Sequence, residues 1–151
     1  KMENQARGKN FLLVTGIIYI VLSVFSIFGV VGSLITINLM HSADTQTVQL
    51  MQQQLAAQNV TLDMMKTSVV LSCIYVVFYM VAGILGIKNR KRTDKAQICF
   101  VIGIILVVLV MGNAVYAVTQ GTFAVWSVAI ALVLPLLYLW GALKNKQTVQ
   151  E

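Results

Sequence analysis

Charged side chains are scarce in this sequence, and its four longest apolar stretches contain no charged residue and no histidine. Only 11% of the 151 residues are charged, whereas an ordinary soluble domain carries roughly a quarter. Transport coupled to protons or ions usually depends on an ionisable side chain within a membrane span. The sequence therefore argues against coupled transport by this chain alone.

Metal ligands and catalytic groups are also scarce. His41 is the only histidine, and the two cysteines, Cys73 and Cys99, do not have the spacing of a zinc or disulfide framework. No serine has a base near it, and no two carboxylates form an evident pair. We therefore expect a non-enzymatic protein with no cofactor and no metal site. Cys99 is either an acylation site or a small apolar core residue, and its position just inside an apolar stretch favours the core.

Hydrophobic residues make up 58% of the chain, and they are concentrated in four runs. About 20 apolar residues suffice to cross some 30 Å of hydrocarbon, where the backbone must be helical because it has no other hydrogen-bond partner. The predicted fold is an all-α, integral membrane four-helix bundle forming one domain over residues 1–151. The predicted spans are residues 11–37, 67–87, 98–118 and 122–143.

Basic residues cluster before the first span, between the second and third, and after the fourth, whereas only Lys66 lies on the other side. By the positive-inside rule both ends and the 88–97 loop are cytoplasmic, and the 38–66 loop is outside. Each basic residue beside the membrane gains about 1 kcal/mol from anionic headgroups. We expect lipid headgroup contacts from Lys88, Arg90, Lys91, Arg92 and Lys95. Nucleic-acid binding is disfavoured because no folded module or aromatic platform accompanies these charges.

The long 38–66 loop contains a glutamine-rich stretch with apolar residues at helical spacing. Val48, Met51, Leu55 and Leu62 define this apolar seam, which predicts an uncharged amphipathic helix on the outer side. Asn59 can end this helix and Thr61 can cap the next one; alternatively, one helix runs through both. Without basic residues on its polar face, the helix suits packing on the span ends, on a second copy or on a partner.

Small residues recur four apart in two of the spans. Gly29 and Ser33 form such a pair on the first span, with Ser26 and Gly32 nearby, and Ala82 and Gly86 form one on the second. Such pairs allow helices to approach closely in lipid, within one chain or between chains.

Asn113 is the polar group that is most costly to expose to lipid. We expect it to face another helix and to form an interhelical hydrogen bond, with a ligand or pore contact as the alternative.

Two further patterns concern repeats and aromatic residues. GIIYIVL at 16–22 resembles GIILVVL at 103–109, and GIKNR at 86–90 resembles ALKNK at 142–146. Duplicated hairpins produce such a pattern, but the restricted alphabet of apolar segments favours chance. Tyr138 and Trp140 are expected to be anchors at the inner interface.

The segment GILGIKNRKRTDKAQICFVIGIIL at 83–106 resembles small four-span membrane proteins of Gram-positive bacteria. The matching positions are Gly83, Gly86, Lys88, Lys95, Ala96 and Cys99. The resemblance covers about a sixth of the chain and implies a bacterial cytoplasmic membrane, but it brings no activity. The layout also looks like the MARVEL and claudin tetraspan groups, although no W-x-x-W motif or pair of loop cysteines accompanies it.

These features predict an accessory or scaffold protein that acts by helix–helix association. Its expected partners are membrane lipids and either a second copy or another membrane protein. The alternative is an oligomeric channel or uncoupled transporter, in which Ser23, Ser26, Thr36 and Asn113 line a weakly polar path.

Overall fold

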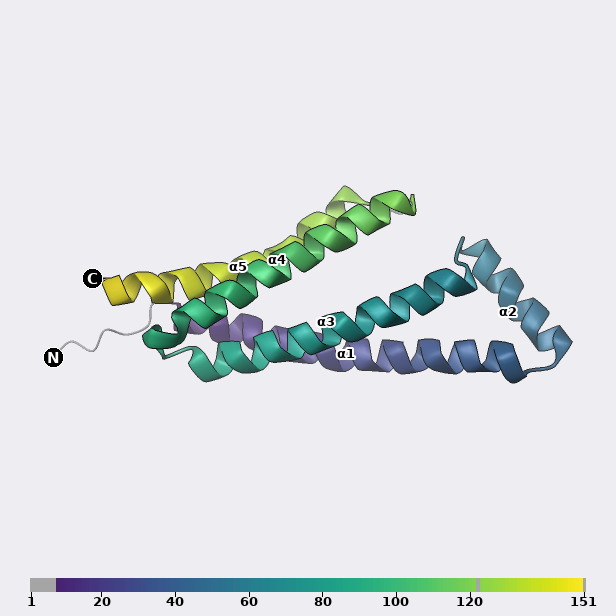
Figure 1. The fold of residues 1–151 in the computed structure, drawn as a ribbon, viewed down its shortest axis with the longest axis horizontal. Coiled ribbons are helices and arrows are strands. Elements are labelled where there is room, and N and C mark those ends of the chain that lie inside the picture. Colours follow the sequence, from purple (N-terminus) through teal and green to yellow (C-terminus); the bar gives the residue numbers. More distant parts are fainter. Residues whose placement is uncertain (1–7, 122, 151) are drawn as a thin grey trace. The chain divides into compact units, whose positions relative to one another are not determined.

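The computed structural model describes residues 8–121 and 123–150, which form five α-helices and a short 3₁₀ helix (Figure 1). The elements are α1 (Lys9–Ser42), α2 (Thr45–Ala57), α3 (Leu62–Asn89), η1 (Thr93–Lys95), α4 (Ala96–Thr119) and α5 (Val125–Gln150). The predicted all-α class is confirmed.

Four helices are long and apolar enough to cross a membrane, and they pack as a bundle. The spans run over Lys9–Ser42, Leu62–Asn89, Thr93–Thr119 and Val125–Gln147. Each helix includes the corresponding predicted apolar run or nearly all of it. Helices α1, α3 and α5 continue beyond theirs, because the polar residues that they add contain no proline or glycine that would end them. The chain is therefore a multi-pass membrane protein with four candidate spans.

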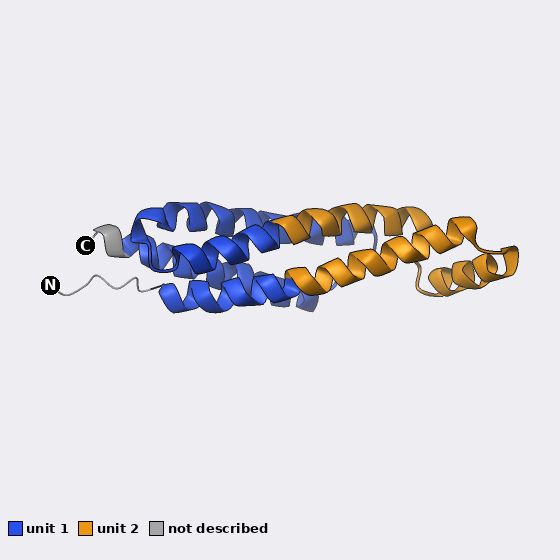
Figure 2. Ribbon diagram, turned by 90° about the horizontal axis from the view of Figure 1, so that it is seen from below, with its two compact units in different colours: residues 1–22, 78–151 blue, residues 23–77 orange. Residues whose placement is uncertain are grey.

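The chain divides into two compact units (Figure 2). Unit 1 comprises residues 1–22 and 78–151, and unit 2 comprises residues 23–77. Helices α1 and α3 each contribute to both units, whereas α4 and α5 belong to unit 1 and α2 belongs to unit 2.

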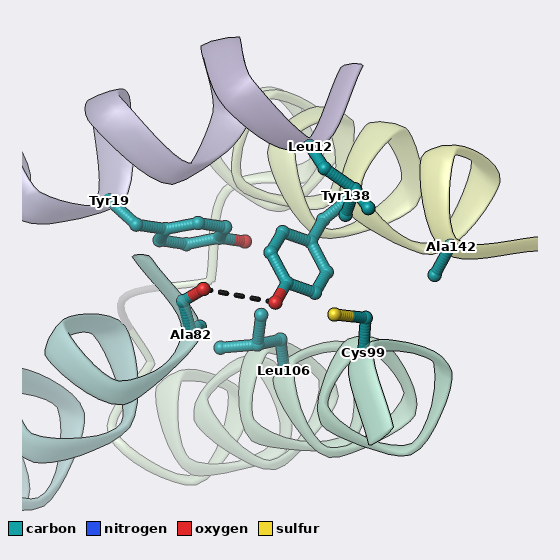
Figure 3. Close-up of a cluster of buried hydrophobic side chains, with 7 residues drawn as sticks. All are labelled: Leu12, Tyr19, Ala82, Cys99, Leu106, Tyr138 and Ala142. Atoms are coloured by element: carbon teal, nitrogen blue, oxygen red, sulfur yellow. Dashed lines mark hydrogen bonds between the residues drawn. The ribbon is translucent and has the colours of Figure 1, made fainter. Parts of the chain in front are cut away.

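The core of unit 1 is formed by side chains from all four long helices (Figure 3). Its members are Leu12, Tyr19, Ala82, Cys99, Leu106, Tyr138 and Ala142. Cys99 is fully buried, in agreement with its predicted core position. Large apolar side chains such as Trp126 point outward with 81% exposure, as expected where lipid tails are as apolar as the protein interior.

Tyr138 differs from its predicted place at the membrane interface, because it is completely buried in this core. Gly86 of α3 explains the difference: a Cβ built on Gly86 lies 2.8 Å from the Tyr138 ring, so the ring occupies space that a larger residue at position 86 would fill. Trp140, two residues further on α5, is 56% exposed.

In unit 2, the chain breaks between α2 and α3 at Asn59. This residue has a positive φ of 54°, a left-handed conformation that asparagine adopts more readily than most residues. The Met64 amide then donates to Thr61 Oγ1 at 3.2 Å, which caps the start of α3. Of the two predicted alternatives, two separate helices are therefore observed.

Candidate functional site

Asn145 on α5 joins three helices at the end of unit 1 where the basic residues gather. Its Oδ1 accepts a hydrogen bond from the Gly8 amide at 2.7 Å. Its Nδ2 donates to the Arg90 carbonyl at 3.0 Å. Helix ends leave such backbone groups without intrahelical partners, and one fully buried amide satisfies a donor and an acceptor at once. Asn145 therefore fixes the start of α1 and the end of α3 to α5.

Sequence reasoning missed Asn145 as a structural residue. Its signal was present, because Asn145 and Asn89 occupy the same position in the two K-N pairs of GIKNR and ALKNK. Both asparagines are buried, at 0% and 3% exposure. Asparagine is rarely buried without hydrogen bonds, so its recurrence beside a lysine after an apolar run was the informative feature.

The predicted headgroup-binding residues surround this end of unit 1. Lys88, Lys91 and Arg92 are exposed, while Arg90 and Lys95 are half-buried. On α5, Lys144 Nζ lies 5.6 Å from the ring centroids of both Phe11 and Trp140. Lysines held over aromatic faces keep a charged head near the interface while their stems cover apolar surface.

At the centre of unit 1, Tyr138 donates a hydrogen bond to the Ala82 carbonyl at 2.9 Å (Figure 3). The Tyr19 ring meets the Tyr138 ring edge-on at 5.9 Å and lies 5.2 Å from the Tyr79 ring. Cys99 Sγ lies 3.8 Å from the Leu85 carbonyl. These groups hold helices together, and within the described residues no cluster of histidine, cysteine or carboxylate side chains could bind a metal.

The predicted small-residue pair of α3 lies inside this core. Ala82 is fully buried, and Gly86 is buried against α1, because a Cβ there would lie 3.3 Å from the Leu12 carbonyl. Gly83 approaches α1 more closely, since its built Cβ lies 2.8 Å from the Gly16 carbonyl. The pair therefore serves packing within the chain.

The predicted small-residue face of α1 lies in unit 2 and, unlike Ala82 and Gly86 of α3, is not part of the buried core. Gly29 is exposed, and Ser26 and Ser33 are half-buried. Within residues 23–77, no heavy atom of another element lies within 4 Å of a Cβ built on Gly29 or Gly32. In unit 2 no other element is therefore packed against Gly29 or Gly32.

Asn113 is exposed on α4, next to Gly112, which also has no neighbouring atom within 4 Å in the described chain. Its exposure places Asn113 outside the buried core of unit 1, and the interhelical hydrogen bond expected for it stays a prediction.

The apolar seam of α2 lies beside the neighbouring ends of α1 and α3. Val48, Met51 and Leu55 of α2 are half-buried, and so is Leu62, which the structure places at the start of α3 and not on the same helix as the other three. A groove of about 500 Å³ opens there. Its lining residues are Met40, His41, Gln52, Leu55, Ala56, Asn59, Val60, Thr61 and Leu62.

Comparison of the chain with protein-family models, curated proteins and solved structures yields no match.

Proposed function

We propose that this chain is a non-enzymatic accessory or scaffold protein of a bacterial cytoplasmic membrane, and that it associates with a second copy through the Gly29 face of α1. This face comprises Ser26, Gly29, Gly32 and Ser33. The supporting observation is a division among the glycines. In unit 1, Gly16, Gly83, Gly86, Gly103 and Gly141 are packed against neighbouring helices. A Cβ built on Gly29 or Gly32 meets no atom of another element in unit 2, and on α4 the same holds for the single Gly112.

The packed glycines of unit 1 show how closely helices of this protein approach one another at a glycine. Built Cβ atoms on Gly16, Gly83 and Gly103 lie 2.9 Å or less from an atom of the adjacent helix. Glycine within a helix costs up to about 1 kcal/mol relative to alanine, and close backbone packing in the membrane offsets this cost. Gly29 and Gly32 carry the same cost, which a helix from another chain would offset.

A second copy is the occupant that best fits the Gly29 face. The face is uncharged, so it can meet itself across a two-fold axis without repulsion. The half-buried hydroxyls of Ser26 and Ser33 can contribute interhelical hydrogen bonds of roughly 0.6–2 kcal/mol each. Large apolar side chains flank it, including Phe25 and Phe28 with exposures of 69% and 70%.

Cysteine crosslinking in native membranes tests this association. In a Cys73→Ser background, Ser33→Cys is expected to form a disulfide-linked dimer on mild oxidation. Ser127→Cys, on an exposed position of α5, is the matched control and is expected to stay monomeric. Equal crosslinking of both variants, or of neither, would overturn the proposal.

A second variant separates self-association from association with another protein. Gly32→Leu in the Ser33→Cys chain is expected to abolish the dimer, whereas Gly112→Leu is expected to leave it. If a photocrosslinker at position 33 links only to other proteins, the second copy is rejected as the occupant. Solute flux through liposomes containing the purified protein would instead favour the oligomeric channel.

We further propose that both ends of the chain face the cytoplasm. The support is that Lys9, Arg90 and Lys146 come from three different segments and all belong to the Asn145 end of unit 1. Positive residues are retained on the cytoplasmic side. In a Cys73→Ser background, Gln53→Cys should react with a membrane-impermeant maleimide in intact cells, and Lys91→Cys only after permeabilisation. The reverse pattern would overturn this orientation.

A further inference from the structure

The repeated motifs of the sequence coincide with equivalent positions in the core of unit 1. Aligning Gly16 with Gly103 gives an offset of 87 residues between α1 and α4. At this offset Val14–Leu22 and Val101–Leu109 are identical at six of nine positions. Aligning Asn89 with Asn145 gives an offset of 56 residues between α3 and α5. These two offsets are set by the sequence motifs alone. The burial and the contacts of the paired positions therefore test them independently.

Burial agrees with both registers. At the first offset Leu12 pairs with Cys99 and Tyr19 with Leu106, and all four have exposures of 0–1%. At the second offset the buried partners are Ala82 with Tyr138, Gly86 with Ala142 and Asn89 with Asn145. Every member of the hydrophobic core cluster of unit 1 therefore has an equivalent position that is also buried.

Contacts within the two hairpins, α1–α3 and α4–α5, are also equivalent. In the first hairpin a Cβ built on Gly16 lies 3.0 Å from the Gly83 carbonyl. In the second, a Cβ built on Gly103 lies 3.2 Å from Leu139 Cα. Gly103 and Leu139 are the positions that the two offsets assign to Gly16 and Gly83. The two helix crossings therefore occur at the same place in each hairpin.

Contacts between the hairpins repeat in the same way, which requires an approximate two-fold axis. Leu12 of α1 touches α5 at Gly141, whose built Cβ lies 3.3 Å from Leu12 Cγ. The equivalent pair is Cys99 of α4 and Leu85 of α3, whose Sγ and carbonyl oxygen lie 3.8 Å apart. At the centre, Tyr138 donates to the Ala82 carbonyl, a bond between two positions that the axis exchanges.

We infer that unit 1 is an internal duplication, in which two copies of one two-helix hairpin pack through a self-complementary surface of the kind that joins identical subunits. This corrects the preference for chance similarity. The two offsets differ because the first hairpin has longer helices on both sides of its connection and carries α2 within it, whereas residues 120–124 join α4 to α5. Each hairpin packs on the other through equivalent positions. Helix α2 belongs to the α1–α3 hairpin and has no counterpart in the α4–α5 hairpin.

An exchange of equivalent core residues tests the duplication in the full chain. The quadruple variant Tyr19→Leu, Ala82→Tyr, Leu106→Tyr, Tyr138→Ala rebuilds the central tyrosine pair from the opposite hairpins. We expect its melting temperature in detergent to stay within about 10 °C of the native value, a few kcal/mol for a chain of this size. Some loss is expected because Pro135 stands where Tyr79 packs on Tyr19 in the native core. The methyl group of Ala142 adds to this loss, because it stands where Gly86 leaves room for the Tyr138 ring.

The matched control has the same composition with one tyrosine at a non-equivalent position. It carries Tyr19→Leu, Leu106→Tyr, Tyr138→Ala and Ala142→Tyr, so that position 142 replaces position 82. We expect this chain to melt well below the exchange variant or to fail to fold. If both variants fold and are equally destabilised, the core positions are not equivalent and the duplication is rejected.

A distance measurement keeps the inference testable even if neither core variant folds. Lys144 approaches Phe11 across the hairpin interface, and the two offsets assign these positions to Lys88 and Ile98. Spin labels at cysteines replacing residues 11 and 144, and separately 98 and 88, should give matching distances in a Cys73→Ser, Cys99→Ala chain. A difference of more than one helical turn, roughly 5 Å, would exclude the two-fold relationship.

Discussion

Tyr138 on α5 donates its phenolic hydrogen to the backbone carbonyl of Ala82 on α3, across 2.9 Å of the buried core. Both residues are completely buried. The carbonyl lies within α3, so the tyrosine adds a second hydrogen bond to an oxygen of the helical backbone. The hydroxyl would otherwise be a bare polar group in an apolar interior, which costs free energy. This bond sets the depth at which the ring sits between the two hairpins.

Tyr138→Phe tests the hydrogen bond separately from the ring. We expect the variant to lose about 0.5–1.5 kcal/mol of stability, because the ring packing is kept and only the hydroxyl is removed. Thermal or denaturant unfolding in detergent measures the change. Tyr116→Phe is the control, since Tyr116 is half-buried and lies outside the core cluster. A Tyr138→Phe chain as stable as native would show that the bond contributes nothing net.

Asn145→Ala should destabilise the basic end of unit 1 more strongly. Its removal leaves the Gly8 amide and the Arg90 carbonyl without their side-chain partner, at about 1–3 kcal/mol for each group left unsatisfied. Hydrogen exchange should rise first at the start of α1 and the end of α3. Gln147→Ala, at an exposed position two residues on, is expected to change neither stability nor exchange. Unchanged exchange at both helix ends in Asn145→Ala would contradict the proposed role.

Two glycine-to-alanine changes are expected to have opposite effects. Gly83→Ala places a Cβ 2.6 Å from Ile20 Cγ1 and 2.8 Å from the Gly16 carbonyl, so α1 and α3 must separate, and we expect a loss of about 1–3 kcal/mol. Gly112→Ala meets no atom within 4 Å in the described chain and should stabilise by up to about 1 kcal/mol through helix propensity. Unfolding midpoints in the same detergent compare the two. Equal effects would show that the close crossing at Gly83 is not required.

Asn59 gives a test of the junction between α2 and α3. Its φ of 54° suits glycine and asparagine, whereas a β-branched residue in this region costs roughly 1–2 kcal/mol. Asn59→Gly is therefore expected to keep the two helices and Asn59→Val to weaken the junction. Hydrogen exchange of the Val60 amide, which bonds the Leu55 carbonyl at 2.9 Å, is the measurement. Slower exchange in Asn59→Val than in native protein would favour one continuous helix.

The spans and the break after α2 were predictable from sequence because each follows from a local rule. An apolar run of span length has to be helical in hydrocarbon, and Asn59 followed by Thr61 combines a residue tolerant of positive φ with a helix cap. The core position of Cys99 was likewise predicted from its type and place, and it is confirmed.

Which face of each helix packs and which faces lipid was decided only by tertiary structure. In a soluble helix the polar residues mark the outer face, but these spans are apolar all round, so Phe28 and Tyr138 look alike in sequence while one is 70% exposed and the other is buried. The same ambiguity hid the difference between the packed Gly86 and the open Gly29. The sequence by itself determined four helices long and apolar enough to cross a membrane, because an apolar run of that length satisfies its own backbone hydrogen bonds in hydrocarbon by forming a helix. The tertiary structure decided that Tyr138 and Asn145 hold those helices together, because their partners are backbone atoms of distant helices.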